Sequence, residues 1–351
     1  MHVAVLGAPS ARGRRVVRDL LERPEVTRVV LAGSDERMLQ RLAAGFGGDL
    51  VTVAHAHPTV EGIAEALNGV DVALAAIDAG TGSGSLHFEA EITSFEAALQ
   101  ARVPYVTACE DPLVVEAMLS LRYAPEHRSQ VPGAAPGTTA TVTADEPVVA
   151  GMSWTPGLSN LLVRAAAERL DTVREVRVAW STSRNDEGAD GLGRLIAGWS
   201  GDATVIKDGA PHRRAPGSRS EQVFFPQPVG WQRVHAVRAA EVATLPQLLP
   251  GLESLSVVGG MGGASASTLA QMVARAPAAA PVAAIAALRR PTEGGPSGRA
   301  GSKSPRSRTT RSTARRRLGV LTHAPALGVG PFSPRPSGWS GLRVDVTGRS
   351  G

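Results

Sequence analysis

A glycine turn near the start of the chain, set between a short apolar run and an amphipathic segment, constrains the fold most. The run HVAVL, His2–Leu6, ends at Gly7, and Arg14–Leu21 carries apolar residues at helical spacing. This order predicts a buried strand, a tight turn and a helix. A helix that begins directly after such a turn aims backbone N–H groups and the positive end of its dipole at one point, which suits an anionic phosphate.

Strand and helix patterns keep alternating beyond this turn. Short apolar runs predict further strands, with helical patterns between them, at Val26–Ala32, Leu50–Ala54, Val70–Ile77 and Pro104–Ala108. Consecutive strands joined by helices need crossover connections, which are right-handed and give parallel pairing. The sequence therefore predicts an α/β protein whose N-terminal part is a doubly wound, Rossmann-type parallel sheet.

A second domain is predicted after residue 148. A helical pattern covers Leu158–Leu170, and strand patterns follow at Glu175–Trp180, Gln222–Phe225 and Leu255–Val258. This mixture predicts a second, mixed α/β domain. We expect the following division: a nucleotide-binding domain over 1–130, a flexible Gly/Pro/Thr-rich insert over 131–147, a substrate and dimerisation domain over 148–275, a disordered Arg-rich segment over 276–339, and a terminal strand within 340–351.

The positive charge of the chain is concentrated in one segment. Arg289–Arg317 holds ten basic residues and one acidic residue, whereas the rest of the chain holds 27 basic and 31 acidic residues. Because this Ser/Arg/Thr segment lacks interleaved aromatic residues, it has no stacking groups for reading bases, and we expect no nucleic-acid partner. No window approaches the ~20 apolar residues of a membrane span, and no export signal is evident, so we expect a cytoplasmic protein without a membrane partner.

Cysteine and histidine usage argues against disulfides and metals. The single cysteine, Cys109, excludes an internal disulfide, and no histidine stands near it in the sequence. The eight histidines are scattered, and none has the spacing of a known metal motif. We therefore expect no metal site and read Cys109 as a small buried residue rather than a nucleophile.

The glycine turn is the predicted site for the pyrophosphate of a dinucleotide. Gly7 suits the sharp bend and Gly13 the close packing of helix on strand, but Ser10 occupies the middle position where a third glycine allows the phosphate to approach. The Ser10 hydroxyl can either crowd the phosphate or bond to it. The predicted cofactor contacts here are Gly7, Ala8, Pro9, Ser10, Ala11, Arg12 and Gly13.

The end of the second strand is expected to select the nucleotide. Ser34 can bond a 2′-phosphate and Arg37 lies one helical turn further on, whereas Asp35 can bond a ribose hydroxyl. We expect NADP, with NAD as the alternative. Ser34 or Asp35 can equally serve as the cap of the following helix.

Chemistry is expected where the last parallel strand ends. Tyr105, Cys109, Glu110 and Asp111 lie at and beyond its C-terminal end, the edge at which ligands bind in open α/β sheets. We take Glu110 and Asp111 as catalytic candidates, because a carboxylate there can accept a proton from an amine, and Tyr105 and Cys109 as substrate contacts. Glu110-Asp111-Pro112 is also an ordinary helix start.

A second set of substrate contacts is expected at the start of the helix from Leu158. Trp154, Ser159 and Asn160 surround a Pro-Gly turn there, so that amides and polar side chains can receive a substrate carboxylate. The alternative is that Pro156 and Gly157 only shape the turn and that Trp154 packs on the sheet.

Several separated segments together resemble the saccharopine dehydrogenase-like oxidoreductases. In order they are VLGAPSARGRRVVRDLLE, FEAALQARVPYVTACEDP, VAGMSWTPGLSNLL, VFFPQPVGWQRVHAVRAAEVATLPQLLPG and SGLRVDVTG. The resemblance implies a Rossmann domain, a substrate and dimerisation domain, a homodimer, and hydride transfer between NAD or NADP and an amine built from amino acids or polyamines. It also places Ala79 and Gly80, after the fourth strand, beside the cofactor, although this chain has Asp78-Ala79-Gly80 and a Thr/Gly/Ser loop where the family has a short Ala-Ala-Gly-Pro turn.

Departures from the family pattern leave a second interpretation open. Ser10 stands where the family tends to have glycine, Arg238–Glu241 replaces an expected His-Pro-Glu run, and the chain stops soon after SGLRVDVTG, as if truncated at its C-terminus. We therefore expect an NAD(P)-dependent oxidoreductase acting on the C–N bond of a small-molecule amine. The alternative is a catalytically silent relative that binds nucleotide or serves as a scaffold.

Overall fold

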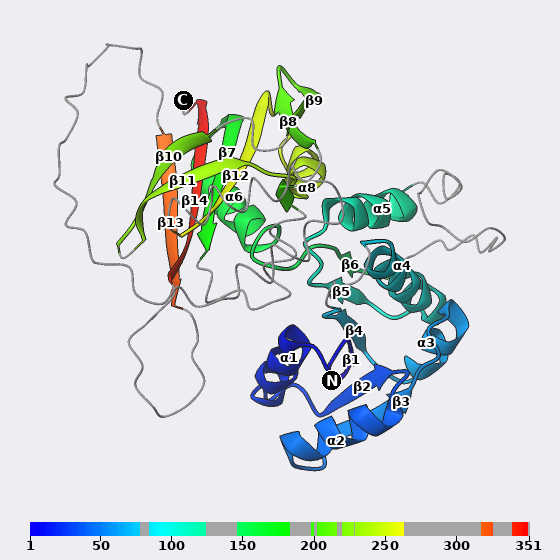
Figure 1. Cartoon of the computed structure of the whole chain (residues 1–351). Helices are drawn as coiled ribbons and strands as arrows, with labels where there is room; N and C mark the ends of the chain where they lie inside the picture. Colours follow the sequence, from blue (N-terminus) through cyan, green and yellow to red (C-terminus); the bar gives the residue numbers. More distant parts are fainter. Residues whose placement is uncertain are drawn as a thin grey trace, which may run out of the picture. The chain divides into compact units, whose positions relative to one another are not determined.

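The chain divides into two compact units. The computed structural model describes residues 1–77, 84–123, 146–182, 198–199, 202–215, 220–227, 229–262, 317–325 and 339–349. The first unit comprises Met1–Leu161 and Arg238–Leu248, and the second comprises Leu162–Val237 and Leu249–Gly351. Each unit contains one sheet (Figure 1).

The first unit is built on a six-stranded parallel sheet with the order β3-β2-β1-β4-β5-β6. Its strands are β1 (His2–Leu6), β2 (Arg28–Gly33), β3 (Val51–His55), β4 (Val72–Ala75), β5 (Tyr105–Thr107) and β6 (Val148–Val149). This is the strand order of a Rossmann fold, in which the order reverses beside β1. The predicted fold class of the N-terminal part is confirmed.

Helices cover both faces of this sheet because its strands are apolar on both sides. The helices are α1 (Ala11–Leu21), α2 (Glu36–Phe46), α3 (Val60–Ala66), α4 (Gly84–Ala101), α5 (Pro112–Tyr123) and α8 (Glu241–Leu248), and α6 (Leu158–Ala167) begins in this unit. Val3 and Val5 of β1 pack with residues of α1 and α2 in one apolar cluster. Ala4 and Leu6, which point the other way, pack with residues of α3, α4 and α5 in another.

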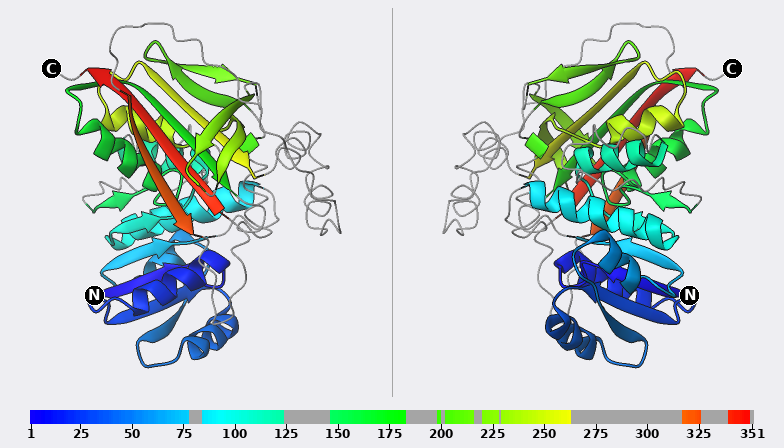
Figure 2. Two further views of the ribbon diagram at one scale, coloured as in Figure 1. Left: turned by 90° about the vertical axis from the view of Figure 1, so that its left-hand side faces the viewer. Right: turned by 90° about the vertical axis from the view of Figure 1, so that its right-hand side faces the viewer.

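The second unit contains an eight-stranded mixed sheet. Its strands are β7 (Thr172–Thr182), β8 (Ala203–Lys207), β9 (Ala210–Arg214), β10 (Ser220–Phe225), β11 (Gly230–Ala236), β12 (Ser254–Met261), β13 (Arg317–Pro325) and β14 (Trp339–Arg349). The main path runs β10-β11-β12-β7-β14-β13, and the β8–β9 hairpin joins through β12. β12 and β7 are parallel, while β14 pairs antiparallel with both β7 and β13 (Figure 2). A second, mixed α/β domain is therefore confirmed.

The expected domain limits and the two units do not coincide. β6 pairs with β5 and completes the first sheet, although residue 148 was the expected start of the second domain. α8 also belongs to the first unit, although it lies inside the range 148–275. β13 lies within 276–339, which we expected to be disordered, and pairs along its length with β14. The expected insert over 131–147 falls outside the described residues except for residues 146 and 147.

Within the described residues, no helix combines the length and the apolar character needed to span a bilayer.

Candidate functional site

The turn from β1 into α1 requires glycine at both of its predicted positions. Gly7 has a φ of 81°, and a Cβ on it would lie 2.7 Å from the carbonyl oxygen of Ala76. A Cβ on Gly13 would run into the carbonyl oxygen of Gly7 and lie 2.7 Å from Cα of Ala8. The strand, the turn and the helix therefore pack as closely as the backbone allows, which is the geometry of a dinucleotide-binding turn.

Ser10 is the N-cap of α1. Its Oγ accepts a hydrogen bond from the backbone N–H of Gly13 at 2.7 Å and donates one to the carbonyl oxygen of Ala76 at 3.0 Å. The hydroxyl thus connects the helix to the residue that follows β4. We had expected it either to crowd a phosphate or to bond to one, and the structure shows a third role, in which it is engaged within the protein.

Two backbone donors of the first helical turn remain without an intrahelical acceptor. The N–H groups of Ala11 and Arg12 begin α1, and the first N–H groups of any helix have no carbonyl one turn before them. Ala8 is buried, and Pro9 is partly buried. The predicted phosphate contacts are therefore brought together at the N-terminus of α1, where the helix dipole is positive.

The side chain of Arg12 connects the glycine turn to the end of β5. Its Nη1 donates to the carbonyl oxygen of Ala108 at 2.5 Å, and its Nη2 lies 3.4 Å from Oε1 of Glu110. Ser153 also donates to Oε1 of Glu110. Arg12, a predicted cofactor contact, and Glu110, a predicted catalytic residue, therefore belong to one partly buried polar group.

Asp111 is a helix cap. Its Oδ1 accepts the backbone N–H of Leu113 at 2.9 Å, at the start of α5. This is the helix-start interpretation that the sequence left open. Asp111 is therefore the weaker of the two catalytic candidates, because its carboxylate already accepts a hydrogen bond from the backbone.

At the end of β2, Ser34, Asp35 and Arg37 are all exposed. Oδ1 of Asp35 accepts the backbone N–H of Met38 at 2.9 Å and caps α2. Asp35 therefore holds the capping role that its sequence context allowed, while Ser34 and Arg37 lie beside it at the carboxyl edge of the sheet. Ala79 and Gly80 lie outside the described residues.

Ser159 and Asn160 connect α6 to α8 through their side chains. The buried Ser159 donates to Oε1 of Glu241 at 2.7 Å, and Nδ2 of Asn160 donates to Oγ1 of Thr244 at 2.9 Å. Both side chains were predicted to receive a substrate, and both are instead engaged in packing two helices. Trp154, in the turn before α6, is partly buried, and its carbonyl oxygen accepts the N–H of Ser159 at 3.1 Å.

Glu241 is a buried acid that sequence reasoning did not select. It is fully buried at the start of α8, and burial raises the pKa of its carboxyl, with the negative charge of Glu110 adding to that effect. Only its neighbours in the folded chain distinguish it from an ordinary helix-start glutamate. The pair Glu110 and Glu241 therefore offers two carboxyl groups in different environments, the pattern that separates a base from an acid.

Tyr105 and Cys109 are core residues rather than surface contacts. Both are buried, and the ring of Tyr105 packs edge-on against Phe95 at 5.7 Å between centroids. Cys109 Sγ lies 3.6 Å from Nε2 of His87, and burial raises the pKa of the thiol. The expected substrate role of both residues conflicts with this burial, because Tyr105 on β5 and Cys109 just after it both contact side chains of α4.

A buried polar cluster therefore lies between α4 and the end of β5. Oγ1 of Thr107 donates to Oε2 of Glu91 at 3.0 Å and accepts the backbone N–H of Cys109 at 3.0 Å. Burial raises the pKa of Glu91 from 4.5 to about 7, while the bond from Thr107 acts in the opposite direction. His87 is 22 residues from Cys109, so the sequence spacing gave no signal for this contact.

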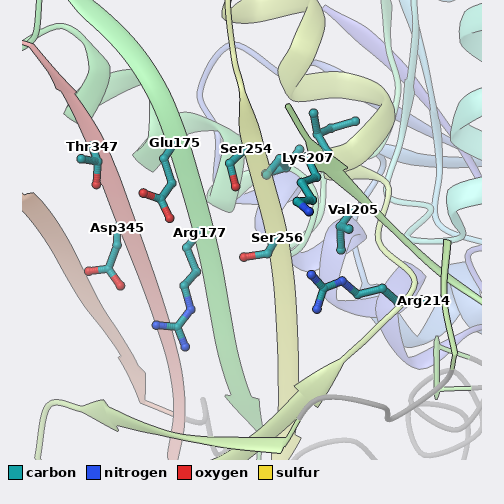
Figure 3. Close-up of a pocket in the computed structure, with 11 residues that line it drawn as sticks. Glu175, Arg177, Val205, Lys207, Arg214, Ser254, Ser256, Asp345 and Thr347 are labelled. Carbon is teal, nitrogen blue, oxygen red and sulfur yellow. The ribbon is translucent and has the colours of Figure 1, made fainter. Parts of the chain in front are cut away.

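The second unit carries a charged pocket of about 220 Å³ on one face of its sheet (Figure 3). Pairing aligns Ser256, Arg177 and Asp345 in one row across β12, β7 and β14, and Ser254, Glu175 and Thr347 in the next. Lys207 and Arg214, from β8 and β9, complete its charged lining. Arg177 pairs with Glu221 at 2.8 Å between Nη2 and Oε1. Alternate residues of the same strands, such as Val176 and Val344, are buried.

Comparison with known proteins gives matches among solved structures alone: no protein-family model matches the sequence, and no curated protein matches it. Apo saccharopine dehydrogenase (L-Glu forming) from Saccharomyces cerevisiae is 15% identical, with 74% of this chain and 54% of that chain covered and a TM-score of 0.49. This enzyme gives its name to the family that the sequence segments resemble. This chain thus spans about half the length of that enzyme.

Other matches cover a smaller share of this chain. The NADPH-dependent quinone oxidoreductase QOR2 of Escherichia coli, complexed with NADPH, is 22% identical over 30% of this chain and 35% of its own, with a TM-score of 0.26. The triphenylmethane reductase of Citrobacter sp., complexed with NADP(H), is 21% identical over 30% and 36%, with a TM-score of 0.26.

Proposed function

We propose that this protein is an NAD(P)-dependent oxidoreductase that acts on the C–N bond of an amino-acid-derived or polyamine-like amine. One observation supports the proposal most: the glycine turn with its required Gly7 and Gly13 stands at β1 of a sheet with the Rossmann strand order. In such sheets ligands bind at the carboxyl ends of the strands, beside the strand where the order reverses. The predicted phosphate contacts and the Arg12–Glu110 group lie at that edge.

The residues at the end of β2 support NADP as the cofactor. Arg37 is exposed and its guanidinium can bind a 2′-phosphate, and Ser34 can donate to the same group. Asp35 would repel a 2′-phosphate, but its carboxylate is directed to the N–H of Met38. NAD is the alternative, in which Asp35 would also accept a ribose hydroxyl.

Glu110 is the residue to which we assign proton transfer. A bound NADP would supply the hydride acceptor for this chemistry, and the amine nitrogen would then have to give up a proton as its C–N bond becomes C=N. The carboxylate of Glu110, paired with Arg12 and bonded by Ser153, is the acceptor of that proton. Glu241, whose raised pKa favours the protonated form, supplies no second base.

The charged pocket of the second unit is consistent with an amino-acid-derived ligand. Its lining combines the cations Arg177, Lys207 and Arg214 with the anions Glu175 and Asp345. Groups of both signs in one small pocket suit a molecule that carries both a carboxylate and an ammonium group. We propose that this pocket binds a small molecule of that zwitterionic kind.

A fluorescence titration with NADPH and with NADH tests the cofactor assignment. We expect saturable binding of NADPH, and we expect Arg37→Ala to weaken it about tenfold, the loss of roughly one charge-assisted hydrogen bond. NADH binding should change little. Arg41→Ala, one turn further along exposed α2, is the matched control and should leave both affinities unchanged. Absence of binding of either nucleotide at millimolar concentration would contradict the proposal.

The alternative is a catalytically silent protein that binds nucleotide or acts as a scaffold. It is favoured by the hydrogen bonds that Ser10 and Arg12 make within the protein, because both side chains already have backbone carbonyl acceptors. Ser10→Gly discriminates between the two proposals. A silent relative whose turn is obstructed should gain cofactor affinity sharply, whereas an enzyme adapted to Ser10 should change little or lose affinity.

A further inference from the structure

Three side chains with metal-binding atoms converge between α4 and the end of β5. His87 and Glu91 are four residues apart, which places them on one face of α4. Cys109 follows β5, and its backbone is fixed by the bond from its N–H to Thr107. The imidazole, carboxylate and thiol each offer one ligand atom, and these atoms all lie within 4.8 Å of one another.

The separation of two of these atoms suits a tetrahedral ion. Zinc lies about 2.3 Å from thiolate sulfur and about 2.0 Å from imidazole nitrogen, which separates two such ligand atoms by roughly 3.5 Å at a tetrahedral angle. Sγ of Cys109 and Nε2 of His87 are 3.6 Å apart. The two atoms are therefore already placed as two ligands of one ion would be.

Glu91 gives an independent sign of a missing partner. Its side chain is fully buried, and Oε2 accepts the bond from Thr107. Among the residues that the structure describes, no donor meets normal hydrogen-bond geometry at Oε1, but the buried Tyr105 hydroxyl interacts with the carboxyl as a hydrogen-bonding neighbour and, like Thr107, lowers its pKa. A buried polar atom without a partner is uncommon in folded proteins, and an ion is one explanation for it.

The charge of the site matches a divalent cation. A carboxylate and a thiolate together carry two negative charges, and a neutral imidazole adds none, so a divalent ion makes the buried group neutral. A ligand set of one nitrogen, one sulfur and one oxygen suits zinc better than magnesium or calcium, which take oxygen ligands. The Thr107 hydroxyl donates a hydrogen bond to Glu91 and so orients this carboxylate as a ligand.

We propose that His87, Glu91 and Cys109 bind one zinc ion that joins α4 to the end of β5. The three ligands come from two elements of the first unit, so the ion stabilises their packing next to Glu110. Burial of Cys109 and Glu91 leaves no approach for a substrate to the thiol, which argues against a nucleophilic role for it. This site does not depend on the nucleotide or on the proposed oxidoreductase activity.

Titration of the chelator-treated, untagged full chain with Co²⁺ tests the site, because cobalt replaces zinc and its absorption reports the ligands. We expect one cobalt per chain and a sulfur-to-cobalt charge-transfer band in the near ultraviolet, displaced by an equivalent of Zn²⁺. The chain has one cysteine, so a thiolate band can arise from Cys109 alone. Absence of the band with the unmutated chain at millimolar cobalt would overturn the proposal.

Variants separate this site from adventitious binding. Cys109→Ser should abolish the band, and Glu91→Gln should weaken cobalt binding at least tenfold. The exposed His55 and His57, whose rings are 4.6 Å apart, are the natural adventitious site, and His57→Ala should leave the band unchanged. Tight cobalt or zinc binding that survives in Cys109→Ser and disappears in His57→Ala would refute the proposed site. Nucleotide binding is measured separately, so the two proposals fail independently.

Discussion

Replacement of Ser10 by alanine tests the role that the structure gives to the residue at the centre of the glycine turn. The substitution removes the N-cap bond to the N–H of Gly13 and the bond to the carbonyl oxygen of Ala76. Loss of an N-cap costs about 1 kcal/mol, and loss of a second neutral hydrogen bond costs about 1 kcal/mol more. We therefore expect the free energy of unfolding of the first unit to fall by about 2 kcal/mol.

Thr59→Ala is the matched control in the same unit. Oγ1 of Thr59 caps α3 by accepting the N–H of Gly62 at 3.1 Å. This variant loses a cap alone, so about 1 kcal/mol is expected. Urea unfolding followed by circular dichroism compares the two variants under the same conditions, and their difference isolates the bond from Ser10 to Ala76. If Ser10→Ala is no more destabilising than Thr59→Ala, the proposed connection between α1 and the end of β4 is wrong.

Two further substitutions test packing and buried charge. Gly13→Ala should strongly destabilise the first unit and abolish nucleotide binding, because the added Cβ would lie 2.7 Å from Cα of Ala8. Gly45→Ala is the control: a Cβ there would have no atom within 4 Å, so this substitution should stabilise α2 by about 0.5–1 kcal/mol. Urea unfolding measures both effects. Glu241 has a raised pKa in the folded state, so its contribution to stability is greatest below the ordinary glutamate pKa and is lost as the pH rises through the raised value. Glu241→Gln should therefore flatten the dependence of the unfolding free energy on pH above the ordinary glutamate pKa, whereas Glu168→Gln, at an exposed position, should not. Equal curves for Glu241→Gln and the unmutated chain would contradict the burial argument.

The first sheet could be predicted because local patterns determine it. Each strand from β1 to β5 is an apolar run between turn signals, and the helices between them carry an apolar face. An apolar strand from Val148 was predicted, but its place in the first sheet was not, because only the pairing of β6 with β5 shows which sheet it joins. The same applies to β13, whose place in the second sheet depends on β14.

The turn of the β8–β9 hairpin could have been predicted from the sequence around it. Asp208 and Gly209 connect the two strands, both with positive φ, at 51° and 76°. An Asp-Gly pair between two alternating segments is a strong hairpin signal, since a type I′ turn needs positive φ at both positions. Applying this rule to Lys207-Asp208-Gly209-Ala210 predicts the turn that the structure contains.

Some residues of the candidate site could be predicted from the sequence, and others could not. The sequence indicated that the glycine turn and Glu110 would lie close together, because a turn after β1 and a carboxylate after β5 reach the same edge of a parallel sheet, and their roles stay predictions. It could not show that Ser159 faces Glu241 across 82 residues or that His87 meets Cys109, since such contacts depend on how helices pack. It also could not show that Tyr105 turns inward rather than towards a ligand.

Hydrogen exchange of the backbone amides with and without saturating NADPH tests most directly whether a nicotinamide dinucleotide binds at the N-terminus of α1. We predict slower exchange in the peptide that contains Gly7–Gly13, where the N–H groups of Ala11 and Arg12 would bond to the pyrophosphate, and unchanged exchange along β7 and β14. Exchange in the Gly7–Gly13 peptide that is unaffected by NADPH and by NADH, or protection confined to the second unit, would contradict the account.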